Sequence, residues 1–256
     1  MMEVLTVISI LVFLLALLVP GLGAAREHAR RVLCQNNLRQ WGIALQCYRD
    51  EHSDYLPMEG TYGGTGVSGA LSLPGRWFNV LPPYIGAPAY RDVEGANVSI
   101  KEFPNLHVWI CPSKSLTDVY KSGTGKNQFH YGMNQVLDGM GSFPNGSTDT
   151  PGYPDPQKAK HLPAKMFQRR PFTVFLFDIA PNSPRGSPRD VATEYYRDFE
   201  GHYSGRFHGD YANFLYINGG VAGFQNSAWV EGNDNRHGRI RWENPQLYWG
   251  YPPPKP

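Results

Sequence analysis

The first 25 residues contain no lysine or arginine, and Glu3 is their only charged side chain. The segment is otherwise almost wholly apolar as far as Leu22. Because a helix rises about 1.5 Å per residue, roughly twenty apolar residues cross the ~30 Å hydrocarbon core of a bilayer. The missing basic start and the length of the run disfavour a cleaved signal peptide, although residues 23–25 have the small side chains of a weak cleavage site. We therefore expect residues 1–23 to span a membrane.

The motifs of common enzyme and cofactor sites are missing as well. The chain has no HExxH zinc motif, no paired cysteine ligands, no phosphate-binding loop and no nucleophile elbow. Its net charge of +2 is too small to indicate a nucleic-acid-binding protein. Basic residues at 169–170 and 236–241 lie near aromatic residues that could stack on bases or sugars, but packing within a folded head explains these aromatics more simply.

Glu3 is the unusual residue of the apolar segment. A carboxylate inside lipid costs on the order of 2.5 kcal/mol or more unless it is paired or lies near the interface. Glu3 could lie at the level of the headgroups, which needs no function. Alternatively, it could meet a positive group, such as the terminal amine of a neighbouring subunit, when these helices bundle. Both interpretations stay open from the residues alone.

The next stretch, residues 24–53, has the pattern of an amphipathic helix. Its apolar residues recur at intervals of four and three, which places them on one helical face, and the charged residues lie mostly off that face. Pro20 lies inside the combined helix, where a proline removes a hydrogen bond and clashes with the preceding turn. We expect one long helix of about fifty residues with a kink at Pro20. The apolar stripe comprises Cys34, Leu38, Trp41, Leu45 and Tyr48.

These segments resemble the prepilin-type N-terminal cleavage and methylation helix of type IV pilins and type II secretion pseudopilins. Glu3 and Pro20 lie at the separation found in that family, within the run E-V-L-T-V-I-S-I-L-V-F-L-L-A-L-L-V-P. More of the chain is similar to a pseudopilin-like family of unknown function with a C-terminal H-x(9)-DG motif. The matching segments are C-Q-N-N-L-R-Q-W-G-I-A-L at 34–45, W-F-N-V-L-P-P-Y at 77–84, I-C-P-S at 110–113, Y-G-M-N at 131–134, F-L-F-D at 175–178 and residues 208–221.

The resemblance implies an α+β, pilin-like fold, in which a long kinked N-terminal helix packs on a loop-rich antiparallel sheet in a head of residues 54–256. It also implies a structural subunit that assembles through its helix into a homo-oligomer or filament, with other pilin-like subunits as further partners. Prepilins carry a short basic leader, cleaved before an aromatic residue. Neither precedes Glu3 here, so a start assigned too late, a missing leader and an unprocessed chain all stay open.

The charge around the apolar run gives a conflicting orientation. Lys and Arg favour the cytoplasmic side of a membrane, and the basic cluster of Arg26, Arg30 and Arg31 follows the run. Taken alone, this cluster would place the head in the cytoplasm. The resemblance implies the opposite, and we follow it. We expect a single-pass inner-membrane protein with its head outside the cytoplasm, or an extracellular filament after assembly.

The head is expected to contain short strands and long loops. Glycine and proline total 50 of 256 residues, and the loops are expected at 60–75 and 138–163. Asn218-Gly219 follows His208 with nine residues in between, where the family has Asp-Gly. Asn-Gly between apolar strands predicts a tight hairpin in which both residues adopt positive φ, and such a turn explains the motif without a binding site. The clearest strands are expected at 108–110, 172–177, 212–217 and 221–225.

The three cysteines allow one intramolecular disulfide. Cys34 and Cys47 are 13 residues apart on the predicted helix, roughly 20 Å, so they cannot bond each other. Cys111 is therefore the partner if a disulfide forms. Cys34 lies on the face turned toward the head, and Cys34 and Cys111 both fall in segments shared with the resembled family. We therefore expect the pair Cys34–Cys111, with Cys47 free, which fits an oxidising compartment.

A few polar residues are candidates for a site. Asp178 ends an apolar strand, and His208 and Asp210 precede another, so the three could meet at one sheet edge and hold a metal. Turn, capping and surface roles explain them more simply. Some pseudopilins bind calcium in a loop of the head, so calcium is the one cofactor we consider. The alternatives to a structural subunit are a membrane-tethered binding module for glycan or metal and, less favoured, an enzyme that uses Asp178 and His208.

Overall fold

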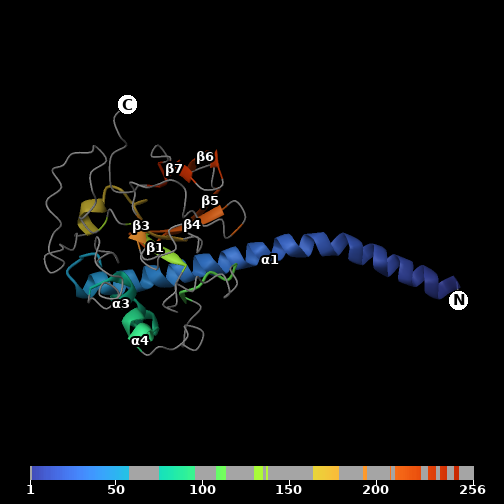
Figure 1. Ribbon diagram of the computed structural model, residues 1–256, viewed down its shortest axis with the longest axis horizontal. Coiled ribbons are helices and arrows are strands. Elements are labelled where there is room, and N and C mark those ends of the chain that lie inside the picture. Colours follow the sequence, from blue (N-terminus) through green and yellow to red (C-terminus); the bar gives the residue numbers. More distant parts are fainter. Residues whose placement is uncertain are drawn as a thin grey trace.

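A long helix, α1, projects from one side of a head that contains the sheet, and its N-terminal end lies far from the head (Figure 1). The expected loops fall outside the described residues, except for Gly75. The computed structural model describes residues 2–57, 75–95, 108–113, 130–134, 137, 164–178, 193–194, 208, 211–225, 230–234, 237–240 and 245–247.

Helix α1 runs without interruption over Met2–Glu51, a length of 50 residues. Within the described residues it is the one helix long and apolar enough to cross a membrane, and none of its most apolar window is buried in the molecule. The helical conformation continues through Pro20. The expected bend takes the form of a gentle curve in the N-terminal part of the helix (Figure 1).

The C-terminal half of α1 packs on the head as its apolar stripe predicts. All five stripe residues are buried, from Cys34 to Tyr48. Trp41 lies at their centre and meets the rings of Trp77 and Trp109 edge-on, with centroids 5.4 and 5.0 Å away. This aromatic cluster forms the core between α1 and the short helices of the head. Those helices are α3 (Trp77–Val80), η1 (Pro82–Ile85), α4 (Tyr90–Gly95) and η6 (Ala164–Phe167).

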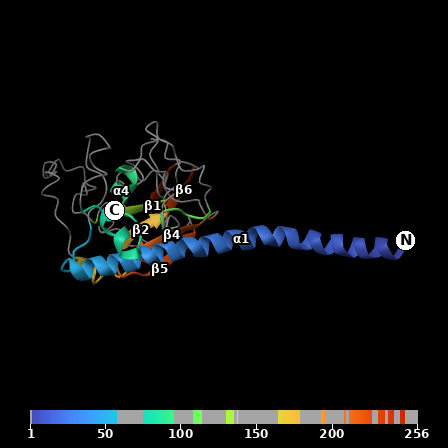
Figure 2. The same cartoon turned by 90° about the horizontal axis from the view of Figure 1, so that it is seen from below.

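The sheet has five strands in the order β3-β1-β2-β4-β5. Four of them are antiparallel to their neighbours, as expected for a pilin-like head, whereas the two-residue edge strand β3 pairs with β1 in parallel. Helix α1 runs along β4 and β5 (Figure 2). The strands are β1 (Tyr131–Asn134), β2 (Val174–Asp178), β3 (Thr193–Glu194), β4 (Tyr211–Tyr216) and β5 (Val221–Gln225), and a separate hairpin pairs β6 (Val230–Asp234) with β7 (His237–Ile240).

The strand predicted at 108–110 is wrong, because these residues form a buried turn. The carbonyl groups of Val108 and Ile110 accept hydrogen bonds from side chains of α1, and that of Trp109 accepts one from the backbone N–H of His130. Trp41 Nε1 donates to Val108 O at 2.8 Å, and Asn37 Nδ2 donates to Ile110 O at 3.2 Å. A short apolar run is therefore buried here without joining the sheet, a distinction that hydrophobic pattern does not make.

The β4–β5 hairpin contains the predicted Asn218-Gly219, but its turn is of a different kind. The N–H of Gly219 donates to Tyr216 O, and the N–H of Tyr216 donates to Gly220 O. Only Gly219 has a positive φ, of 85°, whereas Asn218 has none. The predicted hairpin at Asn218-Gly219 is confirmed, but its loop is three residues long, a turn followed by a left-handed glycine, and only one of the two residues adopts a positive φ.

Candidate functional site

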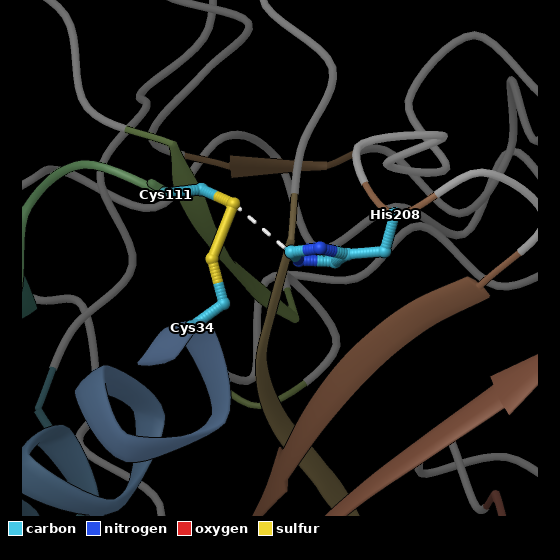
Figure 3. Close-up of side chains that lie close together, drawn as sticks. All are labelled: Cys34, Cys111 and His208. Carbon is cyan, nitrogen blue, oxygen red and sulfur yellow. Dashed lines mark hydrogen bonds between the residues drawn. A yellow bond between two sulfur atoms is a disulfide. The ribbon is translucent and has the colours of Figure 1, made fainter. Parts of the chain in front are cut away.

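A polar cluster lies where α1 meets the head, around the disulfide Cys34–Cys111 (Figure 3). The bond joins the C-terminal half of α1 to the turn at 108–113, with a Cα–Cα distance of 5.3 Å. Both cysteines are fully buried, and Cys47 is half-buried and free. The predicted pairing is therefore confirmed, and it fixes the helix to the head.

His208 completes the cluster from the segment that precedes β4. It is 4% exposed, and its Nε2 lies 3.4 Å from Sγ of Cys111, as Figure 3 shows. Its Nδ1 lies 2.8 Å from Oγ of Ser113, which in turn donates to Oε1 of Glu27 at 2.7 Å. One proton arrangement satisfies these contacts: Nδ1–H donates to Ser113, and Nε2 keeps a free lone pair. That lone pair faces the disulfide.

Asp178, the last residue of β2, lies near the same nitrogen of the imidazole. Its Oδ2 lies 3.7 Å from Nε2 of His208 and accepts hydrogen bonds from the backbone N–H and the side-chain amide of Asn213, at 2.9 and 2.8 Å. Gln35 of α1 donates to Oδ1 of Asn213 at 3.0 Å. Oδ1 of Asp178 is buried and has no hydrogen-bond partner among the residues that the structure describes.

Burial shifts both titratable groups of this contact toward their uncharged forms. It raises the pKa of the Asp178 carboxyl to about 7, against the two hydrogen bonds from Asn213, which lower it. It lowers the pKa of His208, against the Glu27 carboxylate, which raises it. Because both shifts oppose charge, the contact between His208 and Asp178 is not a stable ion pair near neutral pH.

The structure brings together two of the three residues predicted to hold a metal. Asp178 and His208 meet directly, whereas Asp210 lies outside the described residues. Glu27 and Ser113 also belong to the cluster, although they were not predicted as site residues. Ser113 belongs to the I-C-P-S segment and was recognisable from it, but Glu27 reaches His208 only through the packing of α1, which leaves no local sequence signal.

The other end of the His208 motif also contacts α1. The carbonyl of Ile217 accepts hydrogen bonds from Gln46 Nε2 and Arg49 Nη1, at 3.1 and 3.0 Å. A Cβ atom on Gly42 would lie 3.3 Å from the carbonyl oxygen of Gly219, so the turn approaches the helix closely. The Asn-Gly turn therefore docks on the end of α1 that is distant from the disulfide.

The spacing of the motif has a structural explanation. Strand β4 connects His208 to Asn218-Gly219, and six residues of strand span about 20 Å. Cys34 and Gln46 lie twelve residues apart on α1, a distance of about 18 Å. These lengths agree, so the two ends of the motif hold two points of one helix. On the N-terminal side of Cys34, the Arg31 guanidinium also contacts the start of β4, where it stacks on the Tyr211 ring at 4.3 Å.

The residues predicted to direct assembly lie away from this cluster. Glu3 is exposed in the first turn of α1, and Pro20 lies within the apolar part of the helix. Neither is among the residues that contact the disulfide or His208 in the described part of the chain. Helix α1 thus has one half that is held to the head by this cluster, and one apolar half that has no packing partner among the described residues.

Comparison with protein families identifies the middle of the chain. A model described as a protein of unknown function (DUF1559, SBP_bac_10) matches residues 23–173, which include Cys34 and Cys111. The match starts after Pro20 and ends before Asp178 and the His208 motif. No curated protein and no solved structure gave a significant match. Because the family match spans more than half of the residues, this chain belongs to the DUF1559 family.

Proposed function

We propose that the protein is a membrane-anchored, pilin-like structural subunit that assembles through α1 into a homo-oligomer or filament. The observation that carries the proposal is the division of α1 into two halves with different surroundings. The large apolar side chains from Val4 to Leu22 are at least half exposed, whereas the half after Cys34 buries its stripe in the head. The head therefore presents a long apolar helix that has no packing partner within the described residues.

Lipid alone can cover the apolar half of α1, so a membrane anchor without assembly also explains why these side chains are exposed. The outer face of the head-bound half supports contacts with another helix. Val32 is 43% exposed and Ile43 is 59% exposed, and they lie eleven residues apart. Eleven residues are three helical turns, so both side chains lie on one face, turned away from the head. Single exposed apolar residues are common, but this pair extends the apolar surface of α1 beyond the membrane segment.

Glu3 gives the proposed assembly a direction. Its carboxylate lies at the start of an apolar helix, where an unpaired charge in lipid is costly. A positive group on a neighbouring subunit, such as a terminal amine, would remove that cost. Pairing at one level of the bundle would also set the axial register between helices, so Glu3 would act in assembly and not in anchoring.

The disulfide supports placement of the head outside the cytoplasm, because disulfides persist in oxidising compartments. We propose a non-catalytic role that requires neither a cofactor nor nucleic acid. The contacts of His208 and Asp178 support it, since the cluster that could carry chemistry holds α1 to the head. In this proposal the apolar half of α1 crosses the inner membrane before assembly.

Electron microscopy of cells that express the full-length protein with its secretion machinery tests the assembly. We expect surface filaments from the natural sequence and a loss of filaments from Glu3→Ala. Asp50→Ala is the matched control, because Asp50 is an exposed acid of the same helix outside the apolar segment. Absence of filaments from the natural sequence, or equal assembly of Glu3→Ala, would overturn the proposal.

Cross-linking tests the helix contact separately. A Val32→Cys, Cys47→Ser variant carries one exposed thiol on the outer face of α1. Mild oxidation of this variant in membranes should give a disulfide-linked dimer. The Cys47→Ser protein alone should give no cross-linked dimer. Absence of a cross-linked dimer from both variants would count against contacts along this face, but it would not affect the proposed membrane anchor.

A further inference from the structure

We propose that reduction of the Cys34–Cys111 disulfide creates a site for one thiophilic divalent cation such as Zn²⁺. Its ligands are the two thiolates, Nε2 of His208 and the carboxylate of Asp178. The ligand atoms of the two cysteines and the histidine all lie within 4.8 Å of one another. All four residues are buried, so the site would be enclosed by protein. This inference concerns the junction of α1 and the head and does not depend on filament assembly.

Two of the distances between proposed ligand atoms are close to those of a tetrahedral site. Zn–S and Zn–N bonds of about 2.3 and 2.0 Å place sulfur and nitrogen ligands about 3.5 Å apart. Cys111 Sγ and His208 Nε2 are 3.4 Å apart, and His208 Nε2 and Asp178 Oδ2 are 3.7 Å apart. Two sulfur ligands of one zinc ion lie about 3.8 Å apart. Cleavage of the S–S bond leaves the two sulfur atoms free to reach that separation.

His208 is already oriented as metal-bound histidines usually are. A ligating imidazole uses one nitrogen for the metal and donates its other N–H to a carboxylate, carbonyl or hydroxyl group. In this cluster Nδ1 faces Ser113 and Glu27, and Nε2 faces the sulfur atoms. Because Ser113 donates to Glu27, Nδ1–H is the donor to Ser113, and the lone pair of Nε2 is free to bind a cation.

Asp178 provides the fourth ligand. One of its oxygens is held by Asn213, and the other is buried without a hydrogen-bond partner in the described part of the chain. The oxygen that lies 3.7 Å from Nε2 of His208 is Oδ2, so Oδ2 would bind the cation while the hydrogen bonds from Asn213 orient it. The donor set of two thiolates, one imidazole and one carboxylate suits zinc, whose proteins use these ligands in four-coordinate sites.

The conversion of the disulfide into the cation site balances in electrons and protons. A dithiol reductant gives two electrons and two protons to the disulfide and becomes a cyclic disulfide, while Cys34 and Cys111 become thiols. The cation then displaces the two thiol protons and keeps its own charge state. The side chain of Glu27 is 36% exposed, so the cluster has a polar connection to the surface. The same cysteines thus hold either a disulfide or a cation, according to the redox state.

Absorption spectroscopy of the detergent-solubilised full-length protein tests this site. The protein is reduced with a dithiol, separated from the reductant without oxygen, and titrated with Co²⁺. We expect one equivalent to bind with thiolate-to-cobalt charge transfer and the visible bands of tetrahedral Co²⁺, and we expect Zn²⁺ to displace it. The oxidised protein should show neither signal. Reduced protein without charge transfer, or oxidised protein with equal binding, would overturn the proposal.

Single substitutions identify the ligands. His208→Asn and Asp178→Asn should each lower the Co²⁺ affinity by at least about tenfold and change the visible bands, because each removes one ligand. Cys47→Ser is the matched control and should bind as the natural sequence does, since Cys47 is outside the cluster. Circular dichroism of the oxidised variants checks that their fold is kept. Unchanged affinity in both ligand variants would show that the bound ion lies elsewhere.

Discussion

Nε2 of His208 lies 3.4 Å from Sγ of Cys111, although 97 positions separate the two residues in the chain. The contact places the first residue of the H-x(9)-NG motif against the bond that fixes α1 to the head. The motif ends at the turn that receives Gln46 and Arg49 from the same helix. The head therefore holds α1 at two points.

The disulfide should contribute strongly to the stability of the head. It closes a loop of 77 residues, and loop-closure entropy gives about 4 kcal/mol for that length. We expect the double variant Cys34→Ala, Cys111→Ala to melt about 10 °C lower, followed by the fluorescence of the buried tryptophans. Cys47→Ser should melt as the natural sequence does. If the double variant melts at the natural temperature, the bond does not stabilise the folded head.

Asp178 should make the head less stable as the pH rises. Its pKa in the folded protein is raised to about 7, whereas the unfolded chain titrates near 4. The folded state therefore binds the proton more tightly, and the stability from Asp178 is complete below pH 4 and is lost as the pH rises through 7. This difference in pKa corresponds to about 4 kcal/mol of folding free energy, at about 1.36 kcal/mol for each pKa unit.

Asp178→Asn tests this pH dependence, because it keeps the shape of the side chain and removes its ionisation. We expect the melting temperature of the variant, relative to the natural sequence, to rise from pH 4 to pH 8. His208, whose pKa is lowered, has the opposite sign and destabilises the head as the pH falls below 6.5. Because His208 is present in both proteins, its contribution to the pH dependence largely cancels when their melting temperatures are compared. A difference that is constant with pH would contradict the raised pKa.

Gly42 should be required for the close approach of α1 to the β4–β5 turn. A Cβ atom there would meet Leu215 Cδ1 at 3.0 Å and Gly219 O at 3.3 Å. Gly42→Val should therefore lower the stability by about 2 kcal/mol through overpacking. Gly23→Val is the matched control, since a Cβ atom at Gly23 has nothing within 4 Å. Equal melting temperatures for the two variants would show that the helix moves away without cost.

Sequence pattern predicted the parts of the fold that are periodic. The stripe from Cys34 to Tyr48 is buried as expected, because helical periodicity reports which face meets a core. The strands near 172–177, 212–217 and 221–225 were found within two residues of their ends. The disulfide followed from helix geometry, which excluded Cys47 as the partner of Cys34, together with the family resemblance.

The elements that pattern missed depend on tertiary contacts. Residues 131–134 are too few to show alternation and form β1 by pairing with β2. Residues 230–234 and 237–240 carry the charged and glycine-containing sequence of a loop, yet they pair as strands β6 and β7. Of the polar cluster around the disulfide, His208 and Asp178 were predicted as site residues, whereas Glu27 and Asn213 were not. Their contacts with His208 and Asp178 exist only in the folded protein. Spacing along the chain cannot report such contacts.

Ile43 separates the assembly of the protein from its stability. It is 59% exposed on the outer face of α1, so Ile43→Glu should leave the melting temperature of the head unchanged. In a filament that packs along this face, the new carboxylate would be buried without a partner, and we expect a large loss of filaments by electron microscopy. Tyr55→Glu is the control, because Tyr55 is an exposed apolar residue beyond the end of α1. Abundant filaments from Ile43→Glu would show that subunits contact each other only through the membrane half of the helix.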